Sequence, residues 1–182
     1  DNLLVSVLEV CLRRDHTPRN CRVAFSGIEF ARKSCLCTGR VISAMHGVRY
    51  ILEQSYEEGV KYFFGVQGGL ISPLFNELLD HPEIKTILVR HEQAASIEAT
   101  GYAWVTGRAQ LCGGTVGPGV VNLISGLHVA YQNSKPVVAI AANNKSTTFG
   151  KMGTQDSSGW GPRNISQVDM AKPVTKWAAT IF

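Results

Sequence analysis

The sequence predicts an α/β fold in which a parallel sheet is flanked by helices on both faces. From residue 45 onward, apolar segments of strand length alternate with segments whose apolar residues recur at helical spacing. The strand-like segments are continuously apolar, which is typical of parallel strands buried on both faces. A helical segment stands between consecutive strands, as parallel connections require. We therefore expect one three-layer domain over residues 45–182.

The first predicted elements are a helix, a strand and a helix. Residues 46–59 have apolar side chains at helical intervals and stop at a glycine, a common residue at helix ends. Residues 60–66 are short, aromatic and β-branched, and they run into a glycine turn, so a buried strand is expected. The segment 72–82 contains the next helix, with Ser72 as the expected N-cap, Pro73 as the first helical residue and Pro82 just beyond the helix end.

The same alternation continues toward the C-terminus. Strand, helix, strand, helix and strand are expected over residues 85–90, 91–107, 109–115, 117–133 and 135–143. The following segment is rich in Gly, Ser, Thr and Asn and has no periodicity, so we expect a long surface loop. A short helix, a break at Pro173 and a closing strand complete the predicted domain.

Charge and hydropathy argue against two classes of partner. Residues 1–44 carry seven Lys and Arg against four Asp and Glu, whereas residues 45–182 carry eleven against ten. The nearly neutral main part offers little electrostatic attraction to nucleic acid. No apolar run reaches the roughly 20 residues that span a bilayer. We therefore expect neither a nucleic acid nor a membrane as partner.

The first 44 residues are interpreted as an N-terminal extension of unknown role that need not belong to the fold. Four of the five cysteines lie in it: Cys11, Cys21, Cys35 and Cys37. Their spacing matches no zinc site, so no metal ligand is predicted. Without a clear secretory signal, reduced thiols and a cytoplasmic location are expected.

Four loops follow predicted strands and should share one edge of the sheet, where ligands of such folds bind. They are residues 65–70, 90–93, 115–122 and the segment after residue 143. The glycine-rich third loop, in the stretch GGTVGPG, lacks the Lys-Ser/Thr pair of a phosphate loop. It fits close approach of a flat, largely uncharged ligand better.

The second loop contains the ionisable pair His91 and Glu92 at the expected start of a helix. Taken alone, Glu92 is explained as a first-turn glutamate that complements the helix dipole. His91 is explained as an N-cap or a strand end. The dipeptide by itself does not indicate a function.

Four segments in this order resemble the N-terminal pyrimidine-binding domain of thiamine diphosphate-dependent enzymes, in the acetolactate synthase-like branch. They read EEGVKYFFGVQGGLISPLFNELL, IKTILVRHEQAASIEATGYAWVTGR, GGTVGPGVVNLISGLHVAYQNSKPVVAIAAN and AKPVTKWA. The resemblance covers residues 45–181 and implies the thiamine diphosphate-binding fold. It further implies a lyase or transferase, either a carboligase or a 2-oxoacid decarboxylase, that makes or breaks a C–C bond next to a carbonyl.

The resemblance also implies roles for particular residues. The family's glutamate, here Glu92, hydrogen-bonds N1′ of the cofactor pyrimidine and so promotes removal of the thiazolium C2 proton, which makes it the catalytic residue. The other residues expected to bind the cofactor are Val66, Gly68, Thr115, Pro118 and Asn122. Relatives often have Pro at position 67 and an aromatic-Gln-Glu block where residues 162–164 read PRN, so Arg163 or Gln155 could substitute near the substrate.

Family members hold the cofactor diphosphate through Mg²⁺ in a second domain marked by a Gly-Asp-Gly motif, which this sequence lacks. The expected partner is therefore a diphosphate-binding domain or subunit of the same enzyme, in a homo- or hetero-oligomer with a small 2-oxoacid or acyl substrate. The chain is expected to be a fragment or one subunit of a split enzyme. The alternative is a non-catalytic interaction or regulatory module that retains this fold.

Overall fold

The structure is a computed structural model that describes residues 5–10, 47–162 and 165–181. Its α-helices are α2 (Gly47–Glu57), α3 (Ser72–Leu79), α4 (Glu92–Thr106), α5 (Pro118–Gln132) and α6 (Gln167–Ala171). Its strands are β1 (Val5–Val10), β2 (Tyr62–Gly65), β3 (Lys85–Leu88), β4 (Gln110–Gly114), β5 (Val137–Ala142) and β6 (Trp177–Ile181). Short 3-10 turns are η2 (Gly69–Ile71), η3 (Ser146–Thr148) and η4 (Lys172–Val174). None of these helices is long and apolar enough to cross a membrane.

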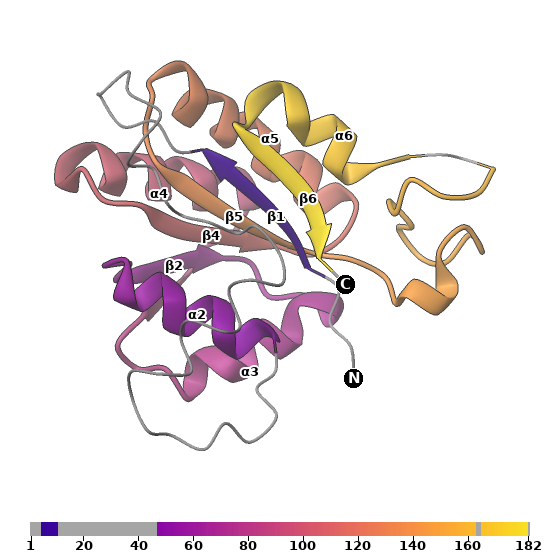
Figure 1. Cartoon of the computed structure of the whole chain (residues 1–182), viewed down its shortest axis with the longest axis horizontal. Helices are drawn as coiled ribbons and strands as arrows, with labels where there is room; N and C mark the ends of the chain where they lie inside the picture. The colour runs from indigo at the N-terminus through magenta and orange to yellow at the C-terminus, as the bar shows by residue number, and fades with distance from the viewer. Residues whose placement is uncertain (1–4, 11–46, 163–164, 182) are drawn as a thin grey trace, which may run out of the picture. The chain divides into compact units, whose positions relative to one another are not determined.

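The strands form one sheet in the order β3-β2-β4-β5-β1-β6. The four strands β2 to β5 are parallel to one another. Helices α2 and α3 pack on one face, and α4, α5 and α6 pack on the other (Figure 1). The predicted α/β class, with a parallel sheet between two helical layers, is confirmed.

Strand β1 was not predicted. It lies between β5 and β6 and runs antiparallel to both. Residues 5–10 thus belong to the sheet, although the first 44 residues were expected to form an extension. The other residues of that segment, including its four cysteines, lie outside the described residues. The domain boundary at residue 45 stays a prediction.

Two strand glycines are explained by one aromatic ring. Phe63 of β2 is fully buried in the core on the α2 and α3 face. A Cβ atom on Gly65 would lie 2.6 Å from this ring, and one on Gly113 would lie 2.8 Å from it. The ring therefore occupies the space that side chains at both positions would need.

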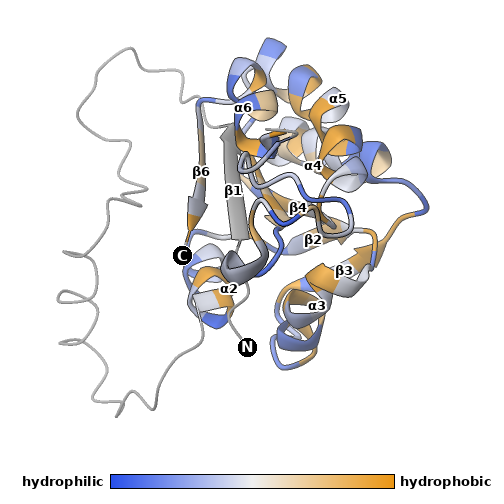
Figure 2. Cartoon of the chain, turned by 90° about the vertical axis from the view of Figure 1, so that its right-hand side faces the viewer, coloured by the Kyte–Doolittle hydropathy of each residue, from blue (hydrophilic) through white to orange (hydrophobic). Residues whose placement is uncertain are grey.

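Two expectations are corrected. β3 was expected to be buried, yet all four of its residues are exposed because it is the edge strand of the sheet. Figure 2 shows this exposed strand in the hydrophobic colour. Ser72 is not an N-cap, because η2 runs directly into α3 and makes Ser72 the first helical residue. Its hydroxyl instead donates to the Gly68 carbonyl at 2.9 Å.

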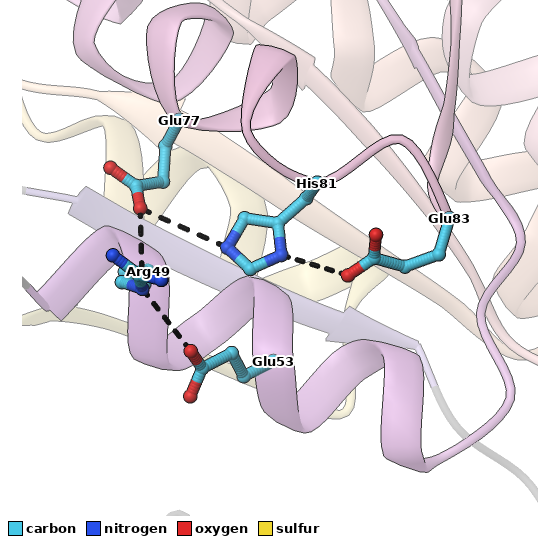
Figure 3. A network of polar contacts seen from close by, with 5 residues as sticks. All are labelled: Arg49, Glu53, Glu77, His81 and Glu83. Carbon is cyan, nitrogen blue, oxygen red and sulfur yellow. Dashed lines mark hydrogen bonds and ion pairs between the residues drawn. The ribbon is translucent and has the colours of Figure 1, made fainter.

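A polar network joins α2, α3 and the turn before β3 (Figure 3). His81 is 5% exposed, and its Nδ1 lies 2.9 Å from Glu83 Oε1. On the other side, Glu77 Oε1 lies 3.8 Å from His81 Nε2 and 3.7 Å from Arg49 Nε. Arg49 also contacts Glu53 within α2, at 3.2 Å. The network ties the helices of this layer together at some distance from the glycine-rich sheet edge.

Candidate active site

Glu92 is held at the carboxyl edge of the sheet by the start of α4. His91 is extended and accepts a hydrogen bond from the Gln93 backbone N–H at 3.2 Å, so its predicted role as N-cap is confirmed. Glu92 is the first residue of the helix and is only 9% exposed. A carboxylate in such a place needs hydrogen-bond donors or a ligand.

The carboxyl group of Glu92 is oriented by α5. Asn122 donates from Nδ2 to Glu92 Oε2 at 3.0 Å. Within the described part of the chain, this is the hydrogen bond that the carboxyl accepts, and Glu92 takes part in no ion pair there. No described residue donates a hydrogen bond to Oε1.

Two glycines make room for this carboxyl group. A Cβ atom on Gly114, at the end of β4, would lie 2.9 Å from Glu92 Cγ. One on Gly119, in the first turn of α5, would lie 3.2 Å from Glu92 Oε1. The buried glutamate thus occupies space that side chains at these positions would fill.

The loops after β2 and β4 meet beside Glu92. A Cβ atom on Gly68 would lie 2.9 Å from Thr115 Cβ, and Thr115 Cγ2 is also close to Gly119. Val66 is half-buried in the first of these loops, and Pro118 is exposed at the start of α5. Gly117 has φ +68°, a conformation that side chains rarely adopt, and it turns the chain into the helix.

The fourth loop closes over this turn. A Cβ atom on Gly117 would lie 3.0 Å from Gln155 Cβ, and Gln155 itself has a left-handed φ of 57°. The Asp156 carboxylate secures the loop by accepting from the Gly150 and Ser158 backbone N–H groups, each at 3.1 Å. Burial pushes the pKa of Asp156 upward, but hydrogen bonds from Ser158, Gly150 and Asn144 outweigh it and lower the pKa.

A buried amide also marks the end of β5. Asn143 is 3% exposed, and its Oδ1 accepts from the Asn144 backbone N–H at 2.9 Å. This bond fixes which way the amide faces, and Nδ2 has no acceptor among the described residues. The residue that follows β5 is thus a buried amide at the same sheet edge.

The structure thus brings together most residues that the sequence singled out. Glu92 and Asn122 touch, Thr115 packs on Gly68, and Val66 and Pro118 stand in the same two loops. Arg163 lies outside the described residues. Gly114, Gly119 and Asn143 were not predicted as site residues. Their sequence signal is their position at strand ends and in the glycine-rich turn.

The fold and the site define the class as an α/β domain with a buried carboxylate at the glycine-rich edge of a parallel sheet. Residues 45–164 match the family described as thiamine pyrophosphate enzyme, N-terminal TPP binding domain. The chain belongs to this family. The predicted resemblance is therefore confirmed, and the chain is the pyrimidine-binding type of domain in a thiamine diphosphate-dependent enzyme family.

Relatives of this chain are acetolactate synthases. The acetolactate synthase of Mycobacterium avium is 36% identical over 130 residues, which cover 71% of this chain and 20% of the relative. A probable acetolactate synthase large subunit of Methanocaldococcus jannaschii is 36% identical over 132 residues, 72% of this chain and 21% of the relative. The acetolactate synthase isozyme 2 large subunit of Escherichia coli is 43% identical over 96 residues, which cover 53% of this chain and 17% of the relative. The chain thus spans about a fifth of the length of these relatives.

The residues present fit the pyrimidine half of the cofactor. A flat heterocycle with a ring nitrogen needs a carboxyl oxygen in its plane and walls without bulky side chains. Glu92 has a carboxyl oxygen, Oε1, to which no described residue donates, and the glycines at positions 114 and 119 leave the room that this side chain occupies. In the part of the chain that the structure describes, no group of three or more His, Cys, Asp and Glu could hold a metal ion.

Proposed function

We propose that this chain supplies the pyrimidine side of a thiamine diphosphate site in an enzyme that makes or breaks a C–C bond next to a carbonyl. The observation that carries the proposal is the buried Glu92 carboxyl, held on one oxygen and available on the other. When bound, thiamine diphosphate supplies the electron sink for this chemistry. An acetolactate synthase-like carboligase fits the names of the relatives. The 2-oxoacid decarboxylase expected from the sequence is the second reaction within this proposal.

In this proposal, Glu92 holds and moves a proton at the pyrimidine ring nitrogen N1′. Its first helical turn packs on an apolar cluster, in which Ala95, Val120 and Leu123 are fully buried. Gly68 and Thr115 form the neighbouring wall, with Val66 and Pro118 in the same loops.

The second half of the site belongs to a partner in this proposal. A diphosphate-binding domain or subunit of the same enzyme supplies the Mg²⁺ ligands, and a small 2-oxoacid or acyl compound is the substrate. The share of the relatives' length that this chain covers supports a further domain. The site then forms in a homo- or hetero-oligomer, and the cytoplasmic location expected from the sequence is part of the same proposal.

Replacing Glu92 with Gln tests the function. We expect Glu92→Gln to lower kcat at least 100-fold in the enzyme assembled from this chain and a diphosphate-binding domain, because an amide cannot exchange the proton. Steady-state kinetics with 2-oxoacids would measure the loss. Glu98→Gln, an exposed position of the same helix, is the matched control and should keep activity. Near-normal turnover in Glu92→Gln would rule out the proposed role.

Calorimetry separates the enzyme from the alternative of a non-catalytic module. Thiamine diphosphate and Mg²⁺ are titrated into the chain with and without the diphosphate-binding domain. The proposal expects saturable binding in the assembled pair that weakens in Glu92→Gln. A pair that assembles without binding the cofactor would support the interaction module instead.

A further inference from the structure

The hydrogen bond between Asn122 and Glu92 indicates a role for Asn122 other than binding the cofactor directly. From the family resemblance, Asn122 is expected to line the pyrimidine pocket. The structure directs its amide to Glu92 Oε2, at 3.0 Å, from a position one turn into α5. Resting on the proposed function, we propose that Asn122 is a positioning residue, which holds one oxygen of Glu92 so that the other faces the ring nitrogen of the ligand.

The geometry leaves little freedom to the rest of the carboxyl group. Cγ of Glu92 lies against Gly114, and Oε1 lies against Gly119, so the side chain fills the gap between the end of β4 and the first turn of α5. A carboxylate can rotate about its last bond. A fixed donor on one oxygen sets this rotation and so sets the direction in which the other oxygen points.

The donor is neutral, which matters for a proton-transferring group. Glu92 has no cationic partner among the described residues. An amide N–H favours the ionised carboxylate more weakly than Lys or Arg does. Asn122 can therefore orient Glu92 and still allow it to exchange a proton with the ligand.

A nuclear magnetic resonance titration tests the contact in the full chain without any cofactor. We expect the ¹⁵N and ¹H resonances of the Asn122 side-chain amide to follow one titration step, and this step should vanish in Glu92→Gln. Asn133 is the internal control, because its amide donates to the Val129 carbonyl at 2.8 Å at the other end of the same helix. An Asn122 amide that titrates identically in Glu92→Gln would overturn the inference.

Kinetics of the assembled enzyme test the consequence. Asn122→Ala should lower kcat about tenfold with a smaller change in KM, since a hydrogen bond to a charged group is lost. The nearly isosteric Asn122→Asp should shift the acidic limb of the pH–rate profile to higher pH, because two adjacent carboxyl groups resist double ionisation. Asn133→Ala should change neither kcat nor the pH–rate profile.

The outcomes distinguish this inference from the proposed function. Loss of activity in Glu92→Gln together with normal kinetics and pH dependence in both Asn122 variants would leave the function standing and remove the positioning role. Full activity in Glu92→Gln would remove the function itself. The isosteric Asp variant keeps the test valid if Asn122→Ala does not fold.

Discussion

Among single residues, the two glycines beside Glu92 matter as much as Glu92 itself, because they have no side chains. Glu92 is buried where Gly114 and Gly119 have no side chains. The glycines are required by close approach, because neither has the positive φ that marks Gly117. The end of β4 and the first turn of α5 therefore determine how much space the buried carboxyl group has.

Gly114→Ala tests this dependence. Its Cβ atom would lie 2.9 Å from Glu92 Cγ and 3.3 Å from the Gly119 carbonyl oxygen. We expect a loss of roughly 1–3 kcal/mol in the free energy of unfolding, as for other overpacked sites. Cofactor affinity in the assembled enzyme should fall as well, because Glu92 must move. Urea denaturation and calorimetry measure the two effects.

The control for this variant is Gly69→Ala in the neighbouring loop. A Cβ atom there meets nothing within 4 Å. Stability and cofactor affinity that are equal in the two variants would contradict the steric explanation.

At the scale of elements, the closeness of α4 and α5 sets the distance between Glu92 and Asn122. A Cβ atom on Gly126 of α5 would lie 2.1 Å from Ser96 Oγ and 2.9 Å from the Ile97 backbone nitrogen. Ser96 is fully buried, and its hydroxyl donates to the Gln93 carbonyl in the first turn of α4. Through Ser96, the contact between the two helices is thus connected to the first turn of α4, which contains Glu92.

Gly126→Ala should separate the two helices. We expect it to lower the free energy of unfolding by roughly 1–3 kcal/mol, since the nearby Ile97 backbone cannot rotate away. Cofactor affinity in the assembled enzyme should also decrease, because the Asn122–Glu92 contact lengthens. Thermal and urea unfolding, followed by circular dichroism, measure the stability term.

Gly101→Ala in α4 is the control, and it should stabilise the protein where Gly126→Ala destabilises it. A Cβ atom at this exposed position meets nothing within 4 Å, so better helix propensity should stabilise the protein by roughly 0.5–1 kcal/mol. Destabilisation of similar size in both variants would show that the helix contact is not the cause.

At the scale of the whole molecule, stability should depend on carboxylates that are ionised in the folded state. A hydrogen bond from His81 is the largest cause that lowers the pKa of Glu83 below its ordinary 4.5. Asp156 has a lowered pKa despite the opposing effect of burial, because of its hydrogen bonds to the loop. A lowered folded-state pKa stabilises the protein above the unfolded value, and this contribution is lost as the pH falls through the folded value.

We therefore expect the free energy of unfolding to fall as the pH decreases below the ordinary values of 4.5 for Glu83 and 3.8 for Asp156. Urea denaturation between pH 7 and pH 3 measures the decline. Asp156→Asn should be less stable than the wild-type chain at pH 7, and the difference should shrink toward pH 3. A difference that stays constant over this range would contradict the role of the ionised Asp156.

The alternation of strands and helices, the start of α4 at Glu92 and the family follow from the order of residues alone, because each rests on periodicity or on short ordered motifs. The hydrogen bond from Asn122 to Glu92 follows from the packing of α5 on α4, since the two residues are 30 positions apart in the chain. The tertiary structure also decided that β3 is exposed and that β1 enters the sheet, because strand order is not encoded in the pattern of any one segment. Local patterns specify elements, whereas the contacts between elements specify which of their side chains can act together.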